Sequence, residues 1–342
     1  MRKLFTFAFA LFATVAMNAQ NVDTSEWNEG DDIASYLNWG DYDGSWSGSK
    51  ASNNNGDYSI STMGDWWKGS MPSEWNEVEG HAAVGFYFDG KQDTDKLTNV
   101  YQVVYFPAGF YTIKVQALYR EGTPIDNFTN HFNKVIKKNA WLYADVLTSN
   151  DPESEVTTSY ETYVRSLATS EQTEGRLHTE TGSWKNDYQY DNKDKETGEK
   201  TSYYCPCCLP GAIAYFVAGK YENELKIILP EAAYVRLGFR KTANITQDWL
   251  VFTNFRIVYN GEADEDAKLE LAVDQFEDLY ASVEEVRDNI DAKGYGALAG
   301  IVGDQLMEIE GVVEKDSYAS VLAGIDRLNK LEDYSTCTFV AL

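Results

Sequence analysis

Alternating apolar and polar positions define two β-rich blocks of this chain, residues 101–120 and 212–259. Within residues 109–120, every second side chain is apolar and most of the others are polar. The apolar set is Tyr111, Ile113, Val115, Ala117 and Tyr119, and the polar set is Thr112, Lys114, Gln116 and Arg120. A period of two residues is typical of a strand with one face on a core. The Pro107-Ala108-Gly109 turn that precedes it predicts a hairpin with residues 99–106.

The same criteria predict a mainly β domain. Runs rich in β-branched and aromatic residues, separated by turn residues, predict strands at 82–88, 99–106, 109–120, 139–146, 212–218, 223–229, 233–240 and 249–259. Such a series is typical of an antiparallel jelly-roll β-sandwich. In the last run, the pattern assigns Trp249, Val251, Phe255, Ile257 and Tyr259 to one face.

A polar, acidic insertion at about 147–211 interrupts the strands. Its one helix-like segment is 160–170. Loops of this length are usually either functional or disordered. Because residues 187–202 are almost entirely polar, we expect that part to be solvated and without regular structure.

The period changes after Gly261. Apolar residues then recur at spacings of three and four in three successive segments, which predicts three amphipathic helices joined by short turns. Their apolar residues include Leu269, Val273 and Phe276, then Leu298, Ile301 and Val302, then Tyr318, Val321 and Leu322. Short joints between helices are typical of a small three-helix bundle. The apolar stripes are interpreted as its core in preference to a partner-binding face.

The first residues have the features of an export signal. Arg2 and Lys3 precede an apolar run from Leu4 to Met17, which is too short to span a bilayer. Cleavage is expected after Ala19, and no Cys follows the run to carry a lipid anchor. The predicted organisation is a signal peptide at 1–19, a sandwich at 20–261 and a helical bundle at 262–342. The protein is therefore expected to be secreted, periplasmic or at the cell surface.

Charge and cysteine content narrow the range of partners. The formal net charge of −25 disfavours binding to nucleic acid or to anionic lipid surfaces. The acidic residues are interpreted as keeping an exported protein soluble, with cation binding as the alternative. The four cysteines, Cys205, Cys207, Cys208 and Cys337, lack the paired spacing of a zinc ribbon. A disulfide and free thiols both remain open for them.

The chain has no recognisable catalytic motif. It lacks a G-x-S-x-G elbow, an H-E-x-x-H helix, a phosphate-binding Walker loop and a dinucleotide glycine motif. We therefore expect a protein that is not an enzyme. Acidic residues in loops have the chemistry of calcium ligands, although neither group matches a strict calcium-loop pattern. These groups are Asp41, Asp43 and Asp57, and Asp89, Asp93 and Asp95.

Several short segments together resemble a known family. They are residues 101–112, 116–120, 140–144, 214–223, 237–241 and 248–256. This series, which spans roughly 22–261, is similar to exported galactose-binding-like jelly-roll modules of Gram-negative anaerobes, the fold of many carbohydrate-binding modules. The helical tail resembles the small bundles that accompany such modules in surface proteins. The resemblance implies a β-sandwich, and it implies a glycan as the ligand.

Sugar recognition uses aromatic faces together with planar polar groups. Of the nine Trp residues, Trp141 and Trp249 lie in predicted strands and are interpreted as core. The tryptophans in polar loops are candidates either for exposed sugar-stacking surfaces or for plugs at the sandwich end. They are Trp39, Trp46, Trp66 and Trp67.

A polar half of the site is expected at one end of the sandwich. If the strands are as predicted, Arg120, Lys241 and Asp248 lie at the end opposite the 107–109 turn. Arg offers fixed donors that suit vicinal hydroxyls or a uronic carboxylate. The alternative is a structural salt bridge between Arg120 and Asp248.

Two functions follow as expectations. The first is a non-catalytic glycan-binding protein that holds sugar through loop Trp or Tyr and Arg or Asp. The second is a cell-surface structural or adhesion protein that binds another protein, for which the bundle would offer a surface. An enzyme with an unrecognised carboxylate pair is a third, more distant option.

Overall fold

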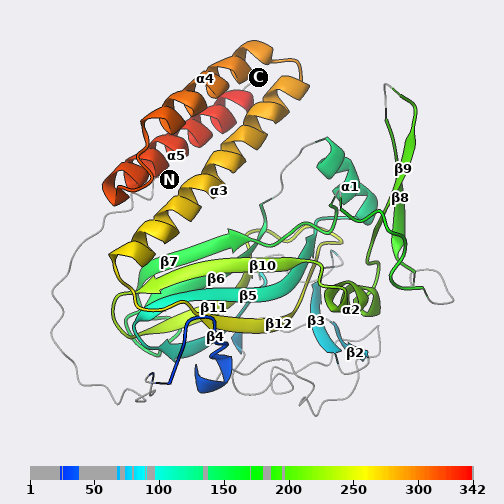
Figure 1. Cartoon of the computed structure of the whole chain (residues 1–342). Helices are drawn as coiled ribbons and strands as arrows, with labels where there is room; N and C mark the ends of the chain where they lie inside the picture. Colours follow the sequence, from blue (N-terminus) through cyan, green and yellow to red (C-terminus); the bar gives the residue numbers. More distant parts are fainter. Residues whose placement is uncertain are drawn as a thin grey trace.

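Two antiparallel β-sheets packed face to face form the main body of the protein, followed by three helices (Figure 1). The computed structural model describes residues 24, 26–37, 68–69, 74–78, 81–88, 90, 97–133, 138–169, 171–179, 186–194 and 197–340. Both the predicted sandwich and the predicted helical bundle are confirmed. No helix in these ranges is long and apolar enough to cross a membrane.

Each sheet has five strands, and all of the pairings are antiparallel. The first, called the β4 sheet, has in spatial order β1 (Lys68–Gly69), β4 (Asn99–Phe106), β11 (Ala233–Lys241), β6 (Ala140–Leu147) and β7 (Val156–Tyr163). The second, the β5 sheet, has β10 (Glu222–Leu229), β5 (Gly109–Arg120), β12 (Trp249–Tyr259), β3 (His81–Tyr87) and β2 (Glu74–Val78).

The predicted hairpin between β4 and β5 is wrong, although both strands have the predicted bounds. The two strands lie in different sheets, so the turn between them crosses from one layer to the other. Phe106 and Tyr111 then meet edge to face inside the sandwich, with ring centroids 5.3 Å apart. The Tyr111 hydroxyl donates to the Pro107 carbonyl oxygen at 2.9 Å. Periodicity identified each strand and its apolar face, but it carries no information on which strand pairs with which.

The inner faces of the two sheets form the main core. The predicted apolar side of β5 points into it, as do alternate residues of β4, β6 and β11. A short 3-10 helix, η1 (Ala34–Leu37), covers one end of this core, and Ile33 before it is fully buried. Burial of so many aromatic and branched side chains is the main driving force for this part of the fold.

The two faces of β12 are exchanged halfway along the strand. A β-bulge lies between Thr253 and Arg256, where Asn254 has a φ of 56°. Before the bulge, Leu250 and Phe252 point into the main core, and Trp249 and Val251 point to the opposite side. The prediction that Trp249 and Val251 share a face with the apolar residues after the bulge is therefore wrong. An extra residue in one strand shifts the alternation by one position.

The insertion also differs from its prediction. Residues 156–163 form strand β7 and not a helix, and residues 188–205 form a hairpin of β8 (Tyr188–Lys193) and β9 (Lys200–Cys205). The predicted strand at 212–218 is helix α2 (Leu209–Val217), which begins with Pro210 in its first turn. A short apolar run does not distinguish a buried helix from a buried strand.

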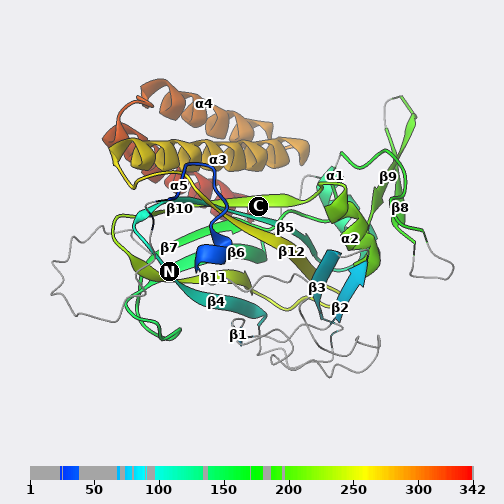
Figure 2. The same ribbon diagram turned by 60° about the horizontal axis from the view of Figure 1, so that its bottom comes forward.

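A second core covers the outer face of the β5 sheet. Helix α1 (Pro124–Phe132) begins with a capping box between Thr123 and Asp126 and lies against the β8–β9 hairpin. Together with α2, these elements bury the apolar side chains that β5 and β12 direct outward. Figures 1 and 2 show α1, α2 and the hairpin gathered at one end of the sandwich. The insertion is therefore part of the folded body where the structure describes it.

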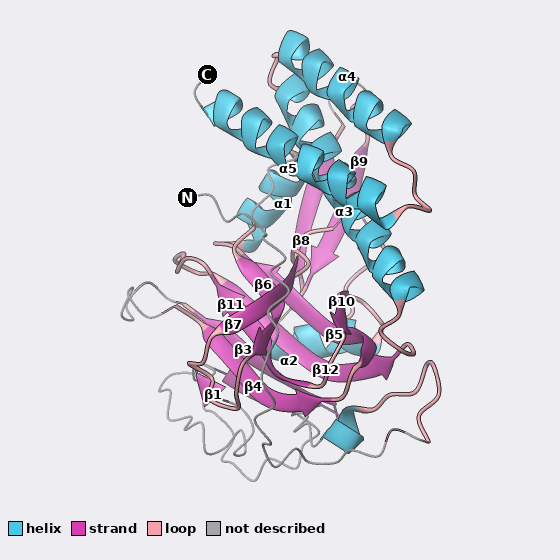
Figure 3. Ribbon diagram, turned by 90° about the vertical axis from the view of Figure 1, so that its left-hand side faces the viewer, coloured by secondary structure: helices cyan, strands magenta, loops and turns pink. Residues whose placement is uncertain are grey.

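The C-terminal helices are α3 (Glu265–Ala292), α4 (Gly296–Val312) and α5 (Tyr318–Val340). They share one apolar core, as predicted. Figure 3 shows the three helices stacked beside the sheets. The contacts with the sandwich are both apolar and polar, and Phe110 and Ile228 of the sandwich pack against Ala267 and Leu271 of α3. Lys138 reaches Glu332 and Ser282 of the bundle, with its Nζ 3.1 Å from the Glu332 Oε1 and 2.9 Å from the Ser282 Oγ.

Candidate functional site

The structure brings Arg120, Lys241 and Asp248 together at one end of the sandwich, but it buries all three. Their exposed fractions are 8%, 3% and 0%. The Lys241 Nζ lies 2.7 Å and 2.9 Å from the two Asp248 carboxylate oxygens. The salt bridge at this end is therefore made by Lys241, where the sequence had suggested Arg120 as the partner. Burial lowers the pKa of Lys241 and raises that of Asp248, because desolvation penalises each charged form.

Arg120 holds the backbone of the loop that joins β11 to β12. Its Nε and Nη2 both donate to the Gln247 carbonyl oxygen at 3.3 Å. The guanidinium carbon lies 5.2 Å from the centroid of the Trp249 ring and 5.7 Å from that of Tyr87. These contacts enclose the guanidinium between aromatic rings, so they orient it inward and away from solvent.

Asn139 and Tyr119 complete this network. The Asn139 side-chain oxygen accepts from the backbone N–H groups of Thr242 and Ala243, and its Nδ2 donates to the Tyr119 hydroxyl at 2.5 Å. The Tyr119 hydroxyl in turn donates to Asp248 at 3.3 Å. Such a chain of buried hydrogen bonds fixes a loop in one conformation. Its geometry suits a structural clamp more than a surface that contacts a ligand.

The other predicted ligands lie outside the residues that the structure describes. These are Trp39, Trp46, Trp66 and Trp67, and the acidic residues Asp41, Asp43, Asp57, Asp89, Asp93 and Asp95. Within the described ranges, no group of three His, Cys, Asp or Glu side chains is arranged to hold a metal ion.

Cys205 and Cys207 are free thiols. Cys205 is buried, whereas Cys207 and Cys208 are half-buried. Desolvation raises the pKa of both Cys205 and Cys207, and the positive charge of Arg120 partly offsets this. A raised pKa disfavours the nucleophilic thiolate form. The side chain of Cys337 is not among those described.

The outer face of the β4 sheet carries a different set of side chains, which we call the aromatic–arginine face. Because successive strand residues alternate between faces, the residues that point away from the core of β4, β11, β6 and β7 form one surface. It includes Tyr101, Tyr105, Trp141, Tyr143, Asp145, Glu161, Tyr163, Tyr234, Arg236 and Arg240. Figure 2 shows these four strands side by side.

The centre of this face is built around a glycine. Gly238 pairs with Tyr101 on one side and with Tyr143 on the other. The Arg240 guanidinium carbon lies 4.4 Å from the centroid of the Tyr143 ring, and that of Arg236 lies 5.7 Å from the centroid of Tyr101. Aromatic side chains beside a strand glycine cover the backbone that a missing side chain would expose.

Acidic side chains fix the two arginines in place. The Arg236 Nη2 lies 2.7 Å from the Asp145 Oδ2, and Arg240 contacts both Asp145 and Glu161. Asp145 is 2% exposed, whereas the side chains of Arg240 and Glu161 are 31% and 41% exposed. The buried carboxylate therefore positions the arginines, and the outer edge of this ion-pair network remains open to solvent.

The face is accessible at its end near β7. Trp141 and Tyr163 are cross-strand neighbours, with ring centroids 4.1 Å apart. Tyr163 is 36% exposed and Trp141 is half-buried, so the interpretation of Trp141 as core is wrong. The Lys138 Nζ lies 4.4 Å from the centroid of the Tyr163 ring. This end thus combines exposed aromatic surface with a guanidinium, a carboxylate and an ammonium group.

Sequence reasoning missed this face, although a signal for it was present. In β6 and β11 the apolar residues Leu142, Ala144, Leu237 and Phe239 alternate with aromatic and charged residues. That alternation predicts a strand with one exposed face. Recognising that several such exposed faces adjoin required the strand order, which the sequence does not give.

Replacing Gly238 with Ala is expected to lower the free energy of unfolding by about 1–3 kcal/mol, as overpacking does. A Cβ at this position would lie 2.0 Å from the Val100 carbonyl oxygen and 2.6 Å from the Tyr101 Cα, so the backbone of β4 must move. Urea denaturation would measure the loss. Gly300→Ala in α4 is the matched control, because a Cβ there meets nothing within 4 Å. An equal response of the two variants would contradict the close packing of β4 and β11.

Comparison with known proteins gives distant similarities to solved structures. No protein-family model matches the chain, and no curated protein matches it. The carbohydrate-binding module TmCBM61, solved in complex with β-1,4-galactotriose, has 12% identity, with 54% of this chain and 74% of that chain covered and a TM-score of 0.18.

Two xyloglucanase structures are also similar. The xyloglucanase domain of NopAA from Sinorhizobium fredii, in complex with cellobiose, has 10% identity over 57% of this chain and 90% of that chain, with a TM-score of 0.21. The family 12 xyloglucanase from Bacillus licheniformis has 9% identity over 56% of this chain and 99% of that chain, with a TM-score of 0.20.

Proposed function

We propose that this protein is an exported, non-catalytic glycan-binding protein and that the aromatic–arginine face holds the sugar. The observation that carries the proposal is the open end of this face, where Trp141 and Tyr163 lie beside Arg240 and Glu161. Aromatic rings contact the apolar C–H surface of a pyranose, while guanidinium and carboxylate groups bond its hydroxyls. The export signal expected in residues 1–19 agrees with a glycan outside the cytoplasm.

Pre-organisation supports the same assignment. Arg240 is held between the Tyr143 ring and the carboxylates of Asp145 and Glu161. A side chain that is fixed before binding loses little conformational entropy when the ligand arrives. The location differs from the one expected from the sequence, which was the sandwich end at Arg120. The buried clamp at that end leaves Arg120 few donors to offer a ligand.

Trp141→Ala is expected to weaken glycan binding about tenfold or more, because a lost aromatic stack of roughly 1.5 kcal/mol corresponds to that ratio. The protein lacking residues 1–19 would be screened on a glycan array, and Kd values for the glycans that bind would be measured by calorimetry. Tyr163→Ala and Arg240→Ala are expected to weaken binding as well.

Tyr334→Ala is the matched control. Tyr334 is an exposed aromatic residue of α5, 52% exposed, and it lies on the bundle. Its replacement should leave glycan binding unchanged. Absence of binding to any glycan would reject the function, and binding that Trp141→Ala and Arg240→Ala leave intact would reject the site.

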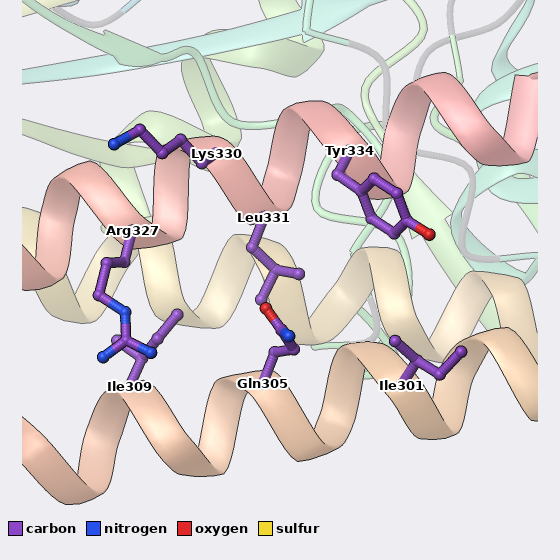
Figure 4. Close-up of a pocket in the computed structure, with 7 residues that line it drawn as sticks. All are labelled: Ile301, Gln305, Ile309, Arg327, Lys330, Leu331 and Tyr334. Atoms are coloured by element: carbon purple, nitrogen blue, oxygen red, sulfur yellow. The ribbon is translucent and has the colours of Figure 1, made fainter.

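The second candidate function is that of a cell-surface structural or adhesion protein. It is favoured by a groove of about 420 Å³ between α4 and α5, shown in Figure 4. The groove is lined by Ile301, Gln305, Ile309, Arg327, Lys330, Leu331 and Tyr334. Ile301 and Tyr334 are each 52% exposed. If Tyr334→Ala abolished attachment to a protein-coated surface while Trp141→Ala did not, this second function would be preferred.

A further inference from the structure

Lys241 and Asp248 form an ion pair that is almost completely closed off from water. The Lys241 side chain is 1% exposed and the Asp248 side chain 0%. The Nζ atom lies 2.7 Å from Oδ1 and 2.9 Å from Oδ2, so it faces the carboxyl carbon that both oxygens share. Lys241 is the last residue of β11, and Asp248 directly precedes β12.

In this ion pair, the ammonium group has fewer hydrogen-bond partners than the carboxylate. An ammonium group has three donors. Within the described structure, the acceptors within hydrogen-bond distance of the Lys241 Nζ are the two oxygens of the one carboxylate, and the ring centroid of Phe88 lies 6.0 Å away. Buried charges recover their desolvation cost only when their remaining donors and acceptors are also satisfied. A neutral product would remove this cost.

We propose that Lys241 and Asp248 condense into an intramolecular amide bond between Nζ and the Asp248 carboxyl carbon. A proton first passes from the ammonium to Oδ1, which leaves a neutral amine and a carboxylic acid. The amine nitrogen then attacks the carboxyl carbon. The C–Oδ1 bond breaks, a second proton moves from nitrogen to the departing hydroxyl, and one water leaves. No oxidant, reductant or further reactant is required.

The surroundings of the pair suit each part of this step. The Ile245 backbone N–H and the Tyr119 hydroxyl both donate to Asp248 Oδ2, at 3.2 Å and 3.3 Å. Two donors on the oxygen that is retained would stabilise the negative charge that develops there in the tetrahedral intermediate. Burial shifts the pKa of Lys241 down and that of Asp248 up, and both shifts favour the neutral forms that react.

The bond would tie the two layers of the sandwich together. β11 belongs to the β4 sheet and β12 to the β5 sheet. The linkage would close residues 241–248 into a covalent ring at the point where the chain passes between the sheets. This inference is independent of the proposed glycan site, which lies on the outer face of the β4 sheet.

Mass spectrometry of the wild-type protein tests the proposal directly. The intact mass is expected to be lower than the sequence mass by one water. In a tryptic digest of the denatured protein, Lys241 should resist cleavage, so that the peptide 241–256 appears with the mass of one water missing. Its fragmentation should give no ions that break the chain between residues 241 and 248.

Two outcomes would overturn the proposal. One is the full sequence mass, with trypsin cutting after Lys241. The other is a one-water deficit together with normal cleavage after Lys241, which would indicate a cyclic imide at an aspartate. Lys241→Arg is the matched variant, since it keeps the positive charge but lacks the amine, and it should show the full mass. If this variant does not fold, the peptide map of the wild-type protein still shows whether the amide bond is present.

Discussion

Asp248→Ala is expected to lower the free energy of unfolding by about 3–5 kcal/mol or more, because it leaves the buried Lys241 charge without a partner and also removes the amide linkage proposed above. The Lys241 ammonium would remain in a site that is 1% exposed. The Ile245 N–H and the Tyr119 hydroxyl would lose an acceptor as well. The loss would appear as a lower urea midpoint, with the transition followed by circular dichroism.

An exposed pair of the same two residue types provides the control. Asp326 and Lys330 form an ion pair on α5, with side chains 64% and 73% exposed. Asp326→Ala should cost less than about 1 kcal/mol, because solvent screens such pairs. The double variant Lys241→Met with Asp248→Asn should lose less stability than Asp248→Ala, since it removes the charge and keeps an acceptor. Equal losses for Asp248→Ala and Asp326→Ala would contradict the burial of the clamp.

Trp249→Ala is expected to cost about 3–5 kcal/mol, as for other large buried aromatic residues. Trp249 is 2% exposed and packs in the second core, between the β5 sheet and the insertion. Its ring also supports the Arg120 guanidinium. The expected loss therefore includes a cavity and a weakened contact to the loop before β12.

Trp249→Ala also tests whether the insertion folds together with the sandwich. In the wild type, unfolding followed by tyrosine and tryptophan fluorescence should coincide with unfolding followed by far-ultraviolet circular dichroism. Tyr334→Ala, an exposed position on the bundle, should change stability by no more than about 0.5 kcal/mol. A change of that small size for Trp249→Ala would mean that the insertion does not cover the β5 sheet.

Most of the strands could be predicted from the sequence because each places one face on the main core, so that apolar residues recur at every second position. In β10, Leu225 and Ile227 point inward while Glu224 is exposed, so the period of two is visible. The three C-terminal helices were equally clear, since each buries one stripe and exposes the rest. Local pattern is informative for such elements, although residues 160–163 of β7, which also has an exposed face, were wrongly expected to be helical.

The errors have physical causes that are not local. Helix α2 is apolar on nearly all sides because it is packed between the β5 sheet and neighbouring insertion segments, so its periodicity is lost. The β8–β9 hairpin is polar on one side and uses Tyr188, Tyr190 and Tyr203 to pack against α1. Contact with α1, which is distant in the sequence, thus stabilises this polar segment as a β-hairpin.

For the polar cluster at the sandwich end, the sequence predicted the position but not the burial. The convergence of Arg120, Lys241 and Asp248 followed from strand directions alone. Successive strands run in opposite directions, so the end of one strand and the start of the next lie at the same end of the sandwich. Their burial did not follow, since it depends on Trp249, Tyr87 and Phe88 closing around them.

By itself, the sequence determined most strands of the sandwich, the three C-terminal helices, the division into a sandwich and a bundle, and a polar cluster at one sandwich end. The tertiary structure alone decided that β4 and β5 lie in different sheets, that the bulge at Asn254 exchanges the faces of β12, and that Trp141 is half-buried on the outer face of the β4 sheet. The reason is that the hydrophobic period distinguishes the two faces of a single strand or helix. Strand pairing and solvent exposure depend on residues distant in the sequence, which come together only when the chain folds.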